Sequence, residues 1–116
     1  MSAFADAEHE LEPEQVAELV RAGEVELIDV REQYEWDAGR IPGARHIELE
    51  RLAANADSIP RERRVVFQCR LGARSGLAAQ AFRAAGWDAW NMTGGIAAWV
   101  ERGLPIEPEG GHVAPH

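Results

Sequence analysis

One short segment, residues 69–75, concentrates the residue types that could do chemistry. It begins with the only cysteine of the chain, Cys69, and follows Val65 to Gln68, an apolar run typical of a buried strand. Apolar residues then recur at helical spacing from about Arg74 to Ala85. In a loop that opens a helix, backbone N–H groups lack helical partners and converge to bind negative charge. We therefore expect the Cys69 thiol to ionise more readily than a free cysteine and to act as the nucleophile.

The remaining loop residues suit the binding of an anionic substrate. Gly72 permits a tight bend or a positive φ, and Arg74 carries a planar fork of donors that matches an oxyanion. A cation at a helix N-terminus is electrostatically unfavourable, which favours a functional role for Arg74. Arg70 either steers the substrate or faces solvent. The predicted substrate-binding residues are Arg70, Leu71, Gly72, Ala73, Arg74 and Ser75.

Other cysteine chemistries are less well supported. A cysteine hydrolase normally uses a histidine base, but three of the four histidines, His9, His112 and His116, lie in expected tails. One cysteine without a paired partner offers too few ligands for a metal site. We therefore do not expect a metal site.

Length and charge narrow the class of protein. At 116 residues the chain fits one compact domain, and 20 acidic against 12 basic residues give a net charge of -8. This balance argues against nucleic acid or an anionic membrane as a partner. Met1 to Glu10 does not resemble an export signal, and a single cysteine cannot form an internal disulfide. The expected location is cytoplasmic.

Helical and strand patterns alternate along the chain, which is typical of an α/β layer architecture. Helices or helical turns are expected at Glu12 to Ala22, Gln33 to Ala38, Leu49 to Ala56, Arg74 to Ala85 and Gly95 to Glu101. Strands are expected at Val25 to Val30, His46 to Ile47, Val65 to Gln68 and Asp88 to Met92. We expect one domain over residues 11–106, with flexible segments at 1–10 and 107–116.

Four motifs in order resemble the rhodanese family. The first is Asp29-Val30-Arg31, the second runs from Glu35 through Gly39 to Ala44, the third is Cys69-x-x-Gly72-x-Arg74-Ser75, and the fourth is Gly94-Gly95-x-x-x-Trp99. The resemblance covers about Leu11 to Ile106. Arg40 stands where many relatives carry His, which we interpret as a tolerated surface change.

The resemblance implies a fold and a reaction. The fold is α/β, with a central, mainly parallel sheet of about five strands flanked by helices and Cys69 at the carboxyl end of a strand. In the implied reaction, Cys69 takes the outer sulfur of thiosulfate or a persulfide donor and passes it to a thiol or to cyanide. The resemblance implies that this reaction needs no metal or organic cofactor. A sulfur-relay protein is a further possible partner. Asp29 and Arg31 are expected to support loops rather than touch substrate.

Two alternatives remain. Related phosphatases and arsenate reductases use a longer loop between cysteine and arginine than the four residues found here, so a phosphate group is less well suited. The chain could also be a rhodanese-like module that only binds or senses, although members of that kind often lack the cysteine.

Overall fold

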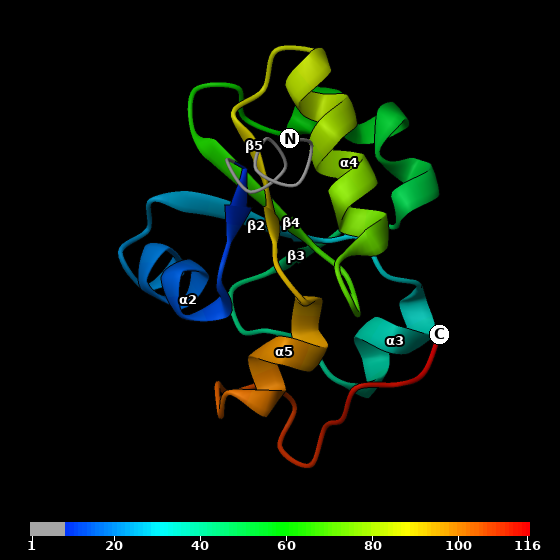
Figure 1. The fold of residues 1–116 in the computed structure, drawn as a ribbon. Helices are drawn as coiled ribbons and strands as arrows, with labels where there is room; N and C mark the ends of the chain where they lie inside the picture. Colours follow the sequence, from blue (N-terminus) through cyan, green and yellow to red (C-terminus); the bar gives the residue numbers. More distant parts are fainter. Residues whose placement is uncertain (1–8) are drawn as a thin grey trace, which may run out of the picture.

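The computed structural model describes residues 9–116 as a parallel five-stranded sheet with helices on both faces (Figure 1). The strands, in the spatial order β1-β5-β4-β2-β3, are β1 (Glu10–Leu11), β5 (Ala89–Met92), β4 (Arg64–Gln68), β2 (Val25–Asp29) and β3 (Arg45–His46). The α-helices are α2 (Pro13–Arg21), α3 (Gln33–Ala38), α4 (Ala73–Ala84) and α5 (Gly95–Glu101). This arrangement confirms the predicted α/β class. Within residues 9–116, no helix has the length and apolar character needed to cross a membrane.

Two elements differ from the sequence prediction. The segment expected to be helical from Leu49 to Ala56 forms two 3-10 segments, η1 (Leu49–Arg51) and η2 (Ala53–Ser58). Their side chains bond to nearby carbonyls, Asn55 to Arg51 O and Ser58 to Asn55 O, which competes with regular helix. Strand β1 was not predicted, because two residues show no periodicity and become a strand only by pairing with β5.

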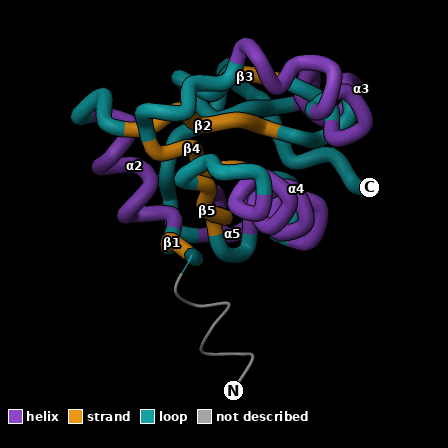
Figure 2. Tube along the Cα trace, turned by 90° about the horizontal axis from the view of Figure 1, so that it is seen from above, coloured by secondary structure: helices purple, strands orange, loops and turns teal. Residues whose placement is uncertain are grey.

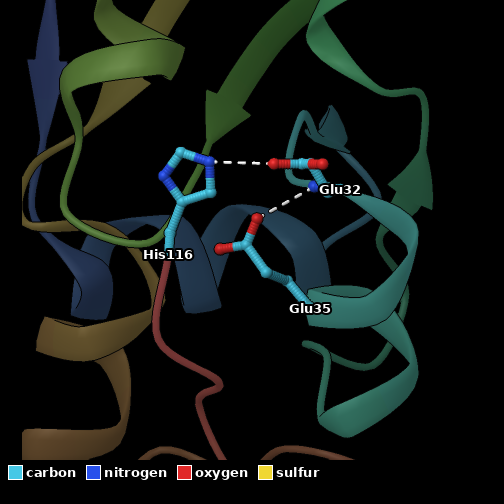
Figure 3. A group of neighbouring side chains, drawn as sticks. All are labelled: Glu32, Glu35 and His116. Atoms are coloured by element: carbon cyan, nitrogen blue, oxygen red, sulfur yellow. Dashed lines mark hydrogen bonds and ion pairs between the residues drawn. The ribbon is translucent and has the colours of Figure 1, made fainter.

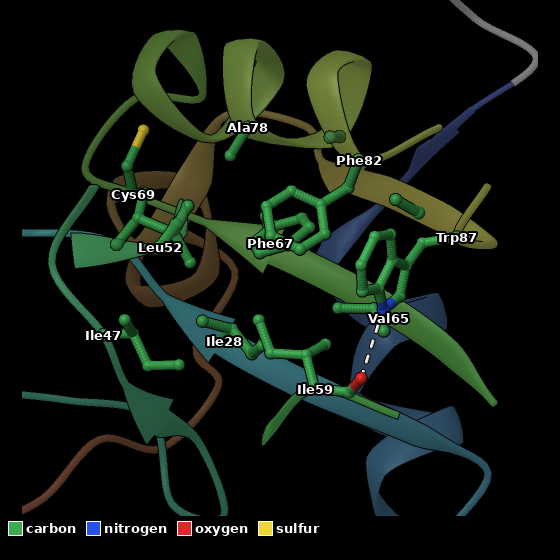
Figure 4. Close-up of a cluster of buried hydrophobic side chains, with 13 residues drawn as sticks. Ile28, Ile47, Leu52, Ile59, Val65, Phe67, Cys69, Ala78, Phe82 and Trp87 are labelled. Carbon is green, nitrogen blue, oxygen red and sulfur yellow. Dashed lines mark hydrogen bonds between the residues drawn. The ribbon is translucent and has the colours of Figure 1, made fainter. Parts of the chain in front are cut away.

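The sheet separates two hydrophobic clusters. Alternate residues of β4 point to opposite faces, with Val65 and Phe67 in one cluster and Val66 in the other. The first cluster lies beneath α4 and includes Phe82 and Trp87 (Figure 4). The second lies beneath α2 and α5 and includes Val16, Ile96 and Trp99, and Figure 2 shows α2 on the other side of the sheet from α4. Cys69 belongs to the first cluster, so the reactive loop is built directly onto the core.

The C-terminal segment 107–116 lies against α3. Arg40 and Glu107 form an antiparallel bridge, the His112 N–H donates to Ala38 O at 2.9 Å, and the Tyr34 hydroxyl donates to Pro115 O at 3.0 Å. Ala114 is 6% exposed. The sequence predicts this segment to be flexible, because it lacks the periodicity of a helix or strand. In the structure it contacts residues that lie far from it in the sequence. Of the predicted flexible N-terminal segment, residues 1–8 lie outside the described residues.

A buried ion pair joins the ends of β2 and α3. Arg31 Nε donates to Asp29 Oδ1 at 2.9 Å, and Nη2 donates to Asp29 Oδ2 at 2.7 Å and to Gly39 O at 2.8 Å. Both side chains are fully buried. His46 Nε2 lies 2.7 Å from Arg31 O, which adds β3 to the same network. Asp29 and Arg31 thus connect the ends of β2, α3 and β3, and their role in supporting the loop at residues 69–75 stays a prediction.

Asp29→Ala is expected to destabilise the fold by about 3–5 kcal/mol, because it leaves the Arg31 charge buried without a partner. Urea unfolding followed by circular dichroism measures this. The matched control is Glu18→Ala, which removes an exposed acidic partner of Arg21 on α2 and should cost less than about 1 kcal/mol. Equal losses in the two variants would contradict a supporting role for the buried pair.

Candidate active site

Two backbone amides of the 69–75 loop converge on the Cys69 sulfur. The N–H of Gly72 donates to Sγ at 3.1 Å, and the N–H of Ser75 donates at 3.4 Å. Gly72 has φ +104° and precedes α4 without a side-chain cap, so the first amides of the helix remain free to face the sulfur. The positive φ predicted as possible at Gly72 is confirmed. The loop therefore offers donors that stabilise negative charge on Sγ.

The start of α5 holds this loop in place. The N–H of Ile96 donates to Cys69 O at 2.9 Å, and that of Ala97 donates to Arg70 O at 3.1 Å. A Cβ at Gly95 would lie 2.2 Å from Cys69 O, a distance that real contacts do not reach. Only glycine permits this approach. Gly95 therefore allows α5 to approach the backbone of the cysteine loop closely.

Access to Cys69 is narrow. The residue is 1% exposed, and it borders a cavity of about 230 Å³. The cavity is lined by Cys69, Arg70, Leu71, Ala73, Arg74 and His116. A space of this size is large enough for a small anion beside the sulfur.

Arg74 forms an ion pair with Glu35. Its Nη1 donates to Glu35 Oε1 at 2.8 Å and its Nη2 donates to Glu35 Oε2 at 3.0 Å, while Glu35 is fully buried. The sequence predicts that the fork of Arg74 faces an oxyanion, but in the structure the end of that fork faces a carboxylate from α3. Its role toward a substrate stays a prediction, and its charge is largely offset by Glu35.

The ion pair between Arg74 and Glu35 shifts the pKa of both side chains. Burial raises the pKa of Glu35, but hydrogen bonds from Arg74 and from the Glu32 backbone outweigh it and hold the pKa below the ordinary value of 4.5. The Glu35 hydrogen bond raises the pKa of Arg74, against the opposing effect of burial. Since the carboxyl pKa is lowered on folding, the pair stabilises the fold above pH 4.5, and this contribution is lost as the pH falls through the lowered value.

Arg70 is the cation without a partner. Within residues 9–116 its side chain makes no hydrogen bond or ion pair, and its Nε is buried without a hydrogen-bond partner. It lines the same cavity as Cys69. Leu71 is 60% exposed beside it, and Ser75 is fully buried behind the sulfur. The predicted loop residues are thus brought together, but they face different surroundings.

His116 places the C-terminal segment in the lining of the same cavity. Its Nε2 lies 3.0 Å from Glu32 Oε2, and Figure 3 shows the ring beside the carboxylates of Glu32 and Glu35. These three side chains offer ligand atoms within 4.8 Å of one another. Both Glu35 oxygens accept hydrogen bonds from Arg74, so a cation there would have to displace the guanidinium.

Sequence reasoning missed Glu35, Asn91 and His116 as site residues. Glu35 lies three residues after Glu32, a spacing that indicates a capping box but not an ion pair with α4. Asn91 accepts a hydrogen bond from the Ser75 hydroxyl at 2.6 Å, but carries no signal for this contact within its strand. His116 lies in a segment without periodicity, so only its contacts reveal its place.

Comparison with known proteins identifies the family. The family model for the rhodanese-like domain matches residues 12–102. A sulfurtransferase of Allochromatium vinosum is 36% identical over 105 residues, covering 88% of this chain and 98% of its own. The putative sulfurtransferase YtwF of Bacillus subtilis is 36% identical over 76 residues, covering 66% of this chain and 74% of its own. The rhodanese-related protein of Thermoplasma volcanium shares the fold, with a TM-score of 0.80 at 24% identity over 85% of this chain and 97% of its own.

Removal of residues 112–116 is expected to speed alkylation of Cys69 by a bulky maleimide several-fold, because His116 is part of the lining of the cavity beside the sulfur. Iodoacetamide, which is smaller, should gain less. Mass spectrometry of the intact chain follows both rates, and Glu109→Ala, at an exposed position of the same segment, is the control. An unchanged maleimide rate in the truncated chain would show that this segment does not restrict access.

Proposed function

The chain belongs to the rhodanese-like domain family, and from this premise we propose that it is a sulfurtransferase that carries sulfur as a Cys69 persulfide. The observation that carries the proposal is the pair of amides, from Gly72 and Ser75, that donate to Sγ at 3.1 and 3.4 Å. Such donors stabilise a thiolate before the reaction, which favours nucleophilic attack. The sulfurtransferase names of two relatives support the same reaction class.

In the first step, the Cys69 thiolate attacks the outer sulfur of a donor such as thiosulfate. A bond forms between Sγ and that sulfur, the sulfur–sulfur bond of thiosulfate breaks, and its electron pair leaves with sulfite. The product is a Cys69 persulfide anion. The size of the cavity, about 230 Å³, favours a donor as small as thiosulfate.

Arg70 is the residue best placed to hold the oxygens of such a donor. Arg70 lines the cavity and has no acidic partner among residues 9–116, whereas Arg74 is bound to Glu35. Since the chain has a net charge of -8, a dianion needs a local positive charge to enter. Arg70 supplies that charge directly beside the nucleophile.

In the second step, a nucleophilic acceptor attacks the outer sulfur of the persulfide. A thiolate acceptor becomes a persulfide and cyanide becomes thiocyanate, while the electron pair of the broken bond returns to Cys69 as thiolate. No redox partner is needed, because the sulfur is transferred between nucleophiles. The narrow access to Cys69 favours small acceptors, and a protein acceptor requires the segment 112–116 to move.

The reaction is tested by the mass of the intact chain after incubation with thiosulfate. We expect the mass of one added sulfur, its removal by cyanide, and neither change in Cys69→Ser. Because Cys69 is the only cysteine, any sulfur gained by the variant would be bound elsewhere and would contradict the persulfide. A chain that takes up no sulfur from thiosulfate or from a small persulfide would be a binding module instead.

Arg70→Ala is expected to slow sulfur uptake from thiosulfate by roughly tenfold or more, since it removes a charge-assisted contact to the donor. Uptake from a persulfide without an anionic group should change much less. Arg21→Ala, at an exposed arginine on α2, is the matched control for net charge. Equal slowing with both donors would remove the assigned role of Arg70.

A further inference from the structure

The hydroxyl of Ser75 lies between the Cys69 sulfur and a second buried polar side chain. Its Oγ is 3.3 Å from Sγ and 2.6 Å from Asn91 Oδ1. Ser75 belongs to the first turn of α4 and Asn91 to β5, and both are at least 95% buried. One hydroxyl therefore faces two atoms that can each accept its single hydrogen.

The orientation of the Asn91 amide is determined by its other partners. Its Nδ2 lies 3.1 Å from each oxygen of Glu10 and 3.2 Å from Gly72 O, and these carboxylate and carbonyl atoms can only accept. Glu10 is itself held by the Thr93 hydroxyl, which donates at 2.8 Å. A flipped amide would turn its oxygen toward these acceptors. Oδ1 must therefore face Ser75.

The Ser75 hydroxyl has a single hydrogen, so the partner that accepts it decides whether a hydrogen or a lone pair faces the sulfur. Oδ1 of Asn91 has no hydrogen to give, so the short contact of 2.6 Å requires the Ser75 hydroxyl to donate to it. The hydroxyl then turns a lone pair toward Sγ. A thiol can donate its hydrogen to this lone pair, whereas a thiolate cannot.

We propose that Asn91, held by Glu10, is a positioning residue that directs the Ser75 hydrogen away from the Cys69 sulfur, so that Ser75 favours the thiol. This inference rests on the proposed role of Cys69 as the nucleophile. Ser75 then opposes the amides of Gly72 and Ser75, which favour the thiolate. This opposing effect of Ser75 keeps the sulfur reactive, because a thiolate that is stabilised too strongly becomes a weaker nucleophile.

The test is the pH dependence of Cys69 alkylation by iodoacetamide in Ser75→Ala, Asn91→Leu and the double variant. Ser75→Ala should lower the pH of half-maximal rate by about 0.5 to 1 pH unit, since it removes an acceptor that serves only the thiol. Asn91→Leu should lower it at least as far, because the freed hydroxyl can donate to the thiolate. The double variant should match Ser75→Ala, because Asn91 acts through Ser75.

A half-maximal pH that is unchanged or raised in Ser75→Ala overturns the proposal, because the hydroxyl would then serve the thiolate. So does an effect of Asn91→Leu that persists in the Ser75→Ala background, since Asn91 would then act without Ser75. Circular dichroism confirms folding, and Asn91→Ala replaces a leucine variant that does not fold. Alkylation needs no sulfur donor, so a failure here is distinct from a failure of sulfur uptake.

Discussion

Two backbone amides converge on the Cys69 sulfur because hydrogen bonds from the start of α5 hold the backbone of Cys69 and Arg70 in place. Ile96 and Ala97 donate to the carbonyls of Cys69 and Arg70, and this contact is close enough that Gly95 cannot carry a side chain. With its carbonyls bound on one side, the loop turns its N–H groups to the other side, toward Sγ. The buried strand β4 fixes where the loop begins, so the core and α5 together place the nucleophile.

The charged and polar groups near the Cys69 sulfur act locally, and some of them offset one another. The chain is strongly acidic overall, yet two arginines flank Cys69. Glu35 pairs with Arg74 and offsets its charge, whereas the Arg70 side chain has no hydrogen-bond or ion-pair partner among residues 9–116. Behind the sulfur, Asn91 accepts the hydrogen of the Ser75 hydroxyl and so directs it away from the sulfur. In the proposed reaction, Arg70 attracts the anionic donor, whereas Ser75 and the loop amides tune the Cys69 sulfur.

Local sequence signals predicted what depends on local physics. The apolar run of β4, the helical spacing of α4 and the glycine that precedes α4 indicated a strand, a loop and a helix around Cys69, and these are present. The pairing of Arg74 with Glu35 and the contact of His116 with Glu32 join residues 39 and 84 positions apart. Strand β1 likewise exists through its pairing with β5. Periodicity carries no information on such distant contacts, so the structure was needed to separate the roles of the two arginines.

The central claim is that the amides of Gly72 and Ser75 stabilise negative charge on the Cys69 sulfur, and their NMR resonances test it most directly. As the pH is raised and the thiol ionises, both amide protons should move downfield together, because a hydrogen bond to an anion is stronger. The same resonances should stay in place in Cys69→Ser. Amides that do not respond to ionisation of Cys69 in the wild-type chain would contradict the account.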